Sequence, residues 1–249
     1  MRQRKVSCFA APKPSSNRRL FILSKYSLFC YNTPMKKSSK PIYWQCGCGK
    51  TKLHEPSRIT VIAMRHGESE HNVLGVVNGD PKKQFNITAK GRKQAQALAK
   101  KLKNKNIAAI ITSQMKRTQE TAAPLAKLKH IKIQVDKRLN DIHAGGLEGV
   151  SILEFRKKTG EIHKSVKGSE TGRQVAMRIK SFLQDLLAYY SGKTVAIVSS
   201  EIILHALRQI AKGKPYDEAK GHHVQNGVAY EFHIHNPVIC ISCGDRARK

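Results

Sequence analysis

Short apolar runs alternate with longer amphipathic segments from residue 58 onward. Runs rich in β-branched residues predict three buried strands, at residues 58–64, 107–112 and 194–199. Apolar residues at helical spacing predict three helices, at residues 88–103, 114–128 and 175–190. Thr88 is a suitable N-cap for the first of these helices. Alternation of apolar and polar residues over 228–235 indicates a final strand.

Strands that alternate with helices predict parallel strands joined by right-handed crossovers. The fold class is therefore α/β, a three-layer α/β/α sandwich with a mostly parallel central sheet and helices on both faces. Ligands bind such sheets at the carboxyl ends of the strands. The segments of interest follow the three predicted strands, at residues 65–72, 113–122 and 199–201.

The charge of the chain favours anionic partners. Among 249 residues, 46 Lys and Arg face 17 Asp and Glu, which gives a net charge of +29. Phosphorylated substrates, nucleic acid and acidic surfaces are the classes of partner that such a surface attracts. A hydrophobic fraction of 40% argues against global disorder. The stretch 20–31 is too short, and Lys25 interrupts it, so we expect no membrane span.

Residues 1–57 read as a basic N-terminal extension, and residues 58–249 as one domain. The first 54 residues contain 12 Lys and Arg, no acidic residue and no sustained periodicity. This composition suits an organelle import peptide, while a translation start at Met35 explains it equally well. We expect a cytoplasmic protein, with organelle import as the alternative.

Six cysteines include a C-x-C and a C-x-x-C pair, at Cys46, Cys48, Cys240 and Cys243. Four thiolates could hold one Zn²⁺ if the two ends of the chain met. The pairs lie far apart in the sequence, so we favour reduced thiols without a metal. No cofactor and no metal is predicted.

Arg65, His66 and Gly67 come directly after the first predicted strand. They supply forked cationic donors, a titratable nitrogen and a backbone that a ligand can approach closely. Arg117 follows the second strand at a helix N-terminus, where backbone N–H groups favour anions. Two arginines near one histidine predict an anion site.

The segment R-H-G-E-S-E-H-N at 65–72 resembles the phosphohistidine signature of the histidine phosphatase superfamily, the phosphoglycerate-mutase-like branch. Supporting segments follow in the family's order, at residues 86–95, 113–122, 138–149 and 168–170, the last ahead of a helix with Arg178. The resemblance covers about residues 59–232. It implies the phosphoglycerate-mutase-like form of the α/β/α sandwich.

The resemblance implies a role for each matching residue. His66 would be the nucleophile and become a phosphohistidine that water hydrolyses. Arg65 and Arg117 would bind the phosphoryl oxygens and stabilise their charge in the transition state. Asn72 would add a neutral donor to the same group.

Asp141 stands where the family usually has a glutamate that acts as general acid for the leaving oxygen. The carboxylic chemistry is kept on a side chain that is one methylene shorter. Glu148, or Glu68 in the first loop, is the alternative acid.

The largest departure from the family follows the third strand, where V-S-H-G is replaced by V-S-S-E. Ser200 replaces the second histidine of the phosphate pocket, so a hydroxyl stands in for an imidazole. By analogy with the loss of one oxyanion-hole donor, the penalty is about 3 kcal/mol. Glu201 replaces the glycine. It could add a negative charge beside a site built for anions, but we favour a carboxylate that points to solvent at a helix N-terminus.

Four other histidines could replace the missing one: His143, His205, His222 and His223. His205 is expected on a different helix face from Ser200. His222 and His223 are the hypothesis we favour among the four, because their loop precedes the last strand and can fold over the strand ends. Each of the four is more often a surface or core histidine.

The sequence thus predicts a metal-independent phosphomonoesterase that acts on a phosphorylated small molecule or a phosphoprotein. Mutase activity is less favoured, because residues 138–149 lack the longer pattern of the family's mutases. The alternative is a catalytically inactive relative that binds an anionic partner, such as RNA or a ribonucleoprotein, through its basic surface.

Overall fold

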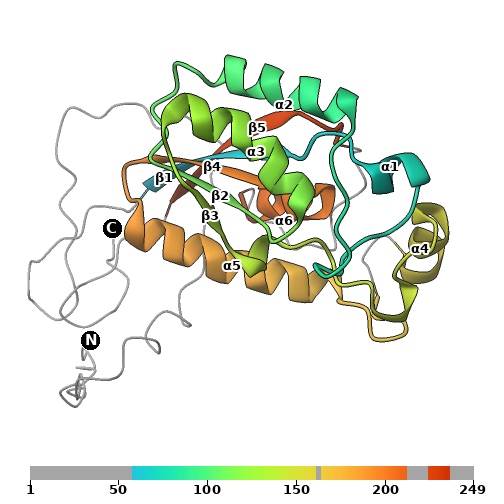
Figure 1. The fold of residues 1–249 in the computed structure, drawn as a ribbon. Helices are drawn as coiled ribbons and strands as arrows, with labels where there is room; N and C mark the ends of the chain where they lie inside the picture. Colours follow the sequence, from blue (N-terminus) through green and yellow to red (C-terminus); the bar gives the residue numbers. More distant parts are fainter. Residues whose placement is uncertain (1–57, 161–163, 212–223, 236–249) are drawn as a thin grey trace, which may run out of the picture.

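A five-stranded sheet forms the centre of the computed structural model, which describes residues 58–160, 164–211 and 224–235 (Figure 1). The strands are β1 (Arg58–Arg65), β2 (Ala109–Thr112), β3 (Ile133–Val135), β4 (Thr194–Ser199) and β5 (Ala229–His235), in the order β3-β2-β4-β1-β5. Three of the four pairings are parallel, while β5 runs antiparallel to β1. The predicted mostly parallel sheet is confirmed.

Helices cover both faces of the sheet (Figure 1). They are α1 (Glu70–Leu74), α2 (Ala89–Lys101), α3 (Lys116–Lys129), α4 (Ile152–Thr159), α5 (Gly172–Tyr189) and α6 (Glu201–Ala211). Two short 3₁₀ turns, η2 (Lys137–Leu139) and η3 (Gly145–Leu147), lie between β3 and α4.

The two faces of the sheet carry separate apolar clusters. In β1, Ile62 and Met64 pack with α2 and α3, whereas Val61 and Ala63 pack with α5 and α6. Successive side chains of a strand point to opposite faces, so a strand that is apolar throughout must be covered on both. This arrangement confirms the three-layer α/β/α sandwich.

Local sequence signals fix the ends of the main helices. The Thr88 hydroxyl accepts a hydrogen bond from the backbone N–H of Gly91 over 3.1 Å, as expected for the N-cap of α2. Thr171 and Gln174 form a capping box at α5, which begins three residues earlier than its apolar stripe predicts. The predicted strands, with β2 two residues shorter, are confirmed.

The strand register places the segments of interest at one edge of the sheet. Arg65 pairs with Ser199 across β1 and β4, and Thr112 pairs with Val198 across β2 and β4. The residues that follow these three parallel strands therefore start side by side. Among the described residues, no helix is long and apolar enough to cross a membrane.

Candidate active site

His66 lies directly after β1 and is buried, with 1% of its surface exposed. Its Nδ1 is 2.8 Å from the carbonyl oxygen of Gly67. A carbonyl can only accept, so Nδ1 carries the proton and Nε2 keeps its lone pair. Burial, followed by the charge of Arg117, holds the pKa of His66 well below its ordinary value of 6.5. The imidazole is therefore neutral and nucleophilic at Nε2.

The loop that carries His66 packs closely against α2 and α3. A Cβ atom at Gly67 would lie 2.6 Å from the carbonyl oxygen of Gly91. The backbone N–H of Gly67 donates to the Thr121 hydroxyl over 3.0 Å. Both glycines are required here for lack of space, and the contact fixes the backbone beside His66.

Arg117 in the first turn of α3 is 1% exposed. Its Nη1 donates to the Asn78 side-chain oxygen over 2.6 Å, and its Nη2 to the Asn78 carbonyl over 3.0 Å. The same Nη2 lies 3.2 Å from an Asp141 carboxylate oxygen. Asn78 therefore orients the Arg117 guanidinium. No motif or position in the sequence indicated this role for Asn78.

Arg65 at the end of β1 is held by α6 and by the segment before β5. Its Nη1 lies 3.0 Å from a carboxylate oxygen of Glu201 and donates to the carbonyl of Val224. The other Glu201 oxygen accepts from the backbone N–H of Val224 over 3.1 Å. The expectation that Glu201 points to solvent is wrong, because its side chain is 14% exposed and pairs with Arg65.

Each of the two guanidinium groups has one buried N–H donor that is not used in a hydrogen bond among the described residues. Within the described residues, Nε of Arg65 and Nε of Arg117 are buried and have no hydrogen-bond partner. An unsatisfied buried donor costs free energy unless a ligand or water satisfies it. An anion with several oxygens fits such a pair of donors, so the predicted anion site is consistent with the geometry.

Asn72 in α1 belongs to a hydrogen-bond network around the nucleophile. Its side-chain oxygen accepts from the backbone N–H of Ser69 over 3.1 Å and from Asn226 over 3.2 Å. Asn226 also donates to the carbonyl oxygen of His66 over 3.0 Å. Asn72 is thus linked to His66 through a residue that no sequence signal identified.

His71 is a second buried histidine beside His66, with ring centroids 5.5 Å apart. Its Nδ1 is 2.7 Å from the Ser69 hydroxyl and its Nε2 is 3.2 Å from Asn72 Nδ2. Burial lowers the pKa of His71 to about 3, so it is neutral at ordinary pH. His71 stands within the segment 65–72, but sequence reasoning gave it no role.

Asp141 and Ser200 contact each other at the edge of the site. The Ser200 hydroxyl donates to an Asp141 carboxylate oxygen over 2.9 Å, and the second oxygen faces Arg117. The alternative acids are bound elsewhere: Glu148 accepts from the backbone of Gly79, and Glu68 from Lys90. Arg65, His66, Asn72, Arg117, Asp141 and Ser200 therefore gather at one edge of the sheet.

The other histidines occupy different surroundings. His205 lies on α6 with its Nε2 3.9 Å from Glu201. His143 lines a pocket next to Asp141. The favoured substitutes His222 and His223, and the four cysteines considered for zinc, lie outside the described residues.

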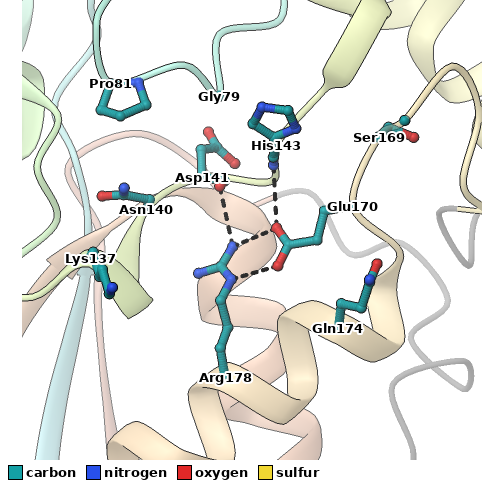
Figure 2. A pocket seen from close by; sticks show the side chains of 11 residues that line it. Gly79, Pro81, Lys137, Asn140, Asp141, His143, Ser169, Glu170, Gln174 and Arg178 are labelled. Atoms are coloured by element: carbon teal, nitrogen blue, oxygen red, sulfur yellow. Dashed lines mark hydrogen bonds and ion pairs between the residues drawn. The ribbon is translucent and has the colours of Figure 1, made fainter.

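A pocket of about 400 Å³ opens beside Asp141 (Figure 2). It is lined by the loop around Gly79, by η2 and by the segment that leads into α5. Figure 2 shows Arg178 reaching up from α5 to the Glu170 carboxylate and to the carbonyl oxygen of Asp141. A leaving group bound to a phosphoryl group near Asp141 has room here.

The described residues contain no group of three or more His, Cys, Asp or Glu side chains that could hold a metal ion. The gathered residues offer a neutral imidazole, two guanidinium groups and a carboxyl group. This set suits attack by nitrogen on phosphorus, with the negative charge held by arginines.

Comparison with known proteins agrees with this geometry. A profile described as the Histidine phosphatase superfamily (branch 1) matches residues 61–238. The chain is 31% identical to Phosphoserine phosphatase 1 of Hydrogenobacter thermophilus over 160 residues, and the match covers 60% of this chain and 74% of that protein. It is 30% identical to a probable phosphoglycerate mutase GpmB of Photorhabdus laumondii over 166 residues, and this match covers 63% of this chain and 76% of that protein. The solved structure of Bacillus stearothermophilus YhfR matches with a TM-score of 0.62 and 27% identity, over 76% of this chain and 94% of that one.

Proposed function

This chain belongs to the histidine phosphatase superfamily, branch 1, and on that premise we propose that it hydrolyses phosphomonoesters through a phosphohistidine on His66. Its relatives are phosphatases and phosphoglycerate mutases. The observation that carries the proposal is the buried neutral imidazole whose Nδ1–H donates to Gly67, which leaves Nε2 for attack. The substrate is a phosphorylated small molecule or a phosphoprotein.

In the proposed reaction, Nε2 of His66 forms a bond to phosphorus while the ester P–O bond breaks. The leaving oxygen takes a proton from Asp141. Water then attacks the phosphohistidine, gives its proton to Asp141 and releases phosphate as the N–P bond breaks. Arg65, Arg117 and Asn72 hold the phosphoryl oxygens in both steps, and the unpartnered Nε atoms of the two arginines support that role.

Asp141 is the acid we favour over Glu148 and Glu68. Its carboxylate contacts Arg117 and Ser200, whereas Glu148 accepts from the backbone N–H of Gly79 and Glu68 accepts from Lys90.

Ser200 is proposed to stand in place of the family's second histidine. Its hydroxyl donates to Asp141 and so holds that carboxyl group in position, but it brings no positive charge to the phosphoryl group. We therefore expect slow turnover rather than none. His222 and His223 remain the proposed substitutes.

The test is steady-state hydrolysis of an aryl phosphate by the full chain with a chelator present. His66→Ala is expected to reduce kcat by at least about 10³-fold, the size of effect seen when a nucleophile is removed. His233→Ala, at an exposed histidine on β5, serves as the matched control. A phosphorylated protein should appear by intact mass spectrometry at early times in the wild type only. Equal turnover in wild type and His66→Ala would refute the proposal.

A second candidate function is binding of RNA by the α2–α3 layer, whether or not the site turns over. Residues 81–135 include α2, β2, α3 and β3 and, apart from the buried Arg117, contain thirteen Lys and Arg but one acidic residue, Glu120. The carboxyl ends of α2 and α3 meet, since Lys129 Nζ donates to the carbonyl oxygens of Lys103 and Lys105. Such a cationic surface suits a phosphate backbone.

Fluorescence anisotropy with a short RNA would test this second function. The double variant Lys100→Glu, Lys101→Glu is expected to weaken binding strongly, and wild-type affinity should fall as salt rises. The control is Lys157→Glu, Arg173→Glu, at exposed positions outside the α2–α3 layer. Equal weakening by both double variants, or affinity that does not respond to salt, would count against it.

Residues 1–57 are proposed to be an extension outside the domain that starts with β1. A cytoplasmic location is our first expectation, and organelle import directed by this segment is the alternative. Fusion of residues 1–57 to a fluorescent protein would separate the two, because only an import segment redirects the fusion.

A further inference from the structure

The carboxylate of Glu201 forms an ion pair with Arg65, one of the two arginines of the candidate phosphate site. One oxygen lies 3.0 Å from Nη1 of Arg65, and the other accepts from the backbone N–H of Val224 over 3.1 Å. The side chains of Arg65 and Glu201 are only 8% and 14% exposed. Their attraction is therefore little screened by solvent.

Glu201 and Asp141 each place a negative charge against one arginine of the site. Glu201 pairs with Arg65, and Asp141 pairs with Arg117. His66, like its neighbour His71, is held neutral by burial. A phosphoryl group carries one to two negative charges, so the Glu201 carboxylate weakens its electrostatic attraction to Arg65.

Arg156 and His205 are two further described groups near the Glu201 carboxylate. Arg156 from α4 has Nη2 at 3.9 Å, but its side chain is 58% exposed, so solvent screens the pair. His205, one turn along α6, has Nε2 at 3.9 Å. Neither contact is as close as the one to Arg65, whose Nη1 lies 3.0 Å from the carboxylate.

We propose that Glu201 is a specificity-determining residue that competes with the phosphoryl group for Arg65, an inference that rests on the proposed function. It lowers the affinity of the pocket for phosphate alone. A substrate must then gain its affinity from its leaving group, in the 400 Å³ pocket beside Asp141. The substrate class is a phosphomonoester with a leaving group large enough to fill that pocket.

The test is calorimetric titration of the full chain with inorganic phosphate at one pH. Glu201→Gln keeps an oxygen for Val224 N–H but removes the charge, and should bind phosphate at least about tenfold more tightly. Glu201→Asp keeps the charge on a shorter side chain and should bind no more tightly than wild type. Glu154→Gln, which breaks the exposed pair with Lys158, is the control and should change nothing.

A second variant at Glu201 shows that the gain in affinity does not depend on one particular side chain. Thermal unfolding of each protein shows whether the variant is folded. Glu201→Ala removes the charge with a different side chain, and it must show the same gain in phosphate affinity. In turnover, Glu201→Gln should lower KM for a small aryl phosphate more than for an ester with a bulky leaving group.

The outcomes separate this inference from the function on which it rests. If wild type and Glu201→Gln bind phosphate equally, or the variant binds it more weakly, Glu201 does not set the affinity, whatever His66 does. If every variant fails to bind phosphate and His66→Ala keeps full turnover, the proposed function is refuted. The proposed role of Glu201 is then refuted as well.

Discussion

Arg178 holds Asp141 by its backbone: Nη2 of Arg178 donates to the Asp141 carbonyl oxygen over 3.2 Å (Figure 2). The same guanidinium donates to both carboxylate oxygens of Glu170, over 2.7 and 2.9 Å. The carbonyl of Arg138 accepts from Nη1. A side chain on α5 thus fixes the segment that carries the proposed acid.

Removal of this support should affect stability and catalysis together. Arg178→Ala leaves Glu170 partly buried without its partner and frees the backbone at Asp141. We expect the free energy of unfolding to fall by about 2–4 kcal/mol, and kcat to fall more than KM rises. Urea denaturation and aryl phosphate kinetics measure the two effects. Arg173→Ala, exposed on the same helix, should alter neither.

Ser200 offers a test of the proposed departure from the family's second histidine. Ser200→Ala removes the hydrogen bond to Asp141, and we expect a loss of about 0.5–1.5 kcal/mol in kcat/KM. Ser200→His restores an imidazole donor and should raise kcat/KM by about 10²-fold over Ser200→Ala. A Ser200→His protein that is folded but slower than Ser200→Ala would show that the imidazole is not what limits the rate.

The buried histidines should make the protein less stable in acid. His71 has a pKa of about 3 in the folded state, and an unfolded chain returns it to about 6.5. Below pH 6.5 the unfolded chain binds the extra proton, so stability falls with pH until about pH 3. The slope is up to about 1.4 kcal/mol per pH unit for this residue, and no dependence is expected above pH 6.5.

His71→Gln should make that slope shallower. Gln can replace the hydrogen bonds to Ser69 and Asn72 but has no proton to gain. Urea denaturation at pH 7.5, 6.0 and 5.0 measures the slope. His233→Gln, at an exposed position, is the control. An unchanged slope in His71→Gln would mean that other groups govern acid stability.

Gly91 provides a test of the packing beneath the nucleophile. A Cβ atom there would lie 2.1 Å from the carbonyl oxygen of Glu68, so Gly91→Ala must push α2 away from the loop that carries His66. We expect a loss of about 1–3 kcal/mol in stability, despite the better helix propensity of alanine, and reduced kcat. Gln96→Ala, exposed on the same helix, should leave both unchanged.

Periodicity predicted the layers because the long elements carry strong patterns. β1 and β4 each contain an unbroken apolar run, at 61–64 and 195–198, and α5 presents a continuous apolar stripe that includes Val175, Ile179 and Leu183. β3 was missed because it has three residues, of which one is Gln134 and two are exposed. Periodicity also could not reveal that β5 runs antiparallel, because direction depends on the path of the preceding chain.

The sequence predicted only those residues of the candidate site that belong to a motif or follow a strand. Arg65, His66 and Arg117 stand next to strand ends, so the sheet rule and the resemblance found them. Asn78 and Asn226 orient those groups from loops without any pattern, and only folding brings them there. Glu201 was misplaced because its position at a helix N-terminus suggested solvent, whereas the turn of α6 directs it to Arg65.

The sheet order has a consequence for how the chain is made. β1 is produced first among the strands, yet both of its neighbours, β4 and β5, come from the last third of the domain. During synthesis β1 must wait for residues 194–199 before it gains its first partner in the described sheet, and for residues 229–235 before it gains the second. Such long-range pairing slows folding and exposes an aggregation-prone strand in the meantime. Nascent chains that stop short of β5 should therefore depend on chaperones to stay in solution.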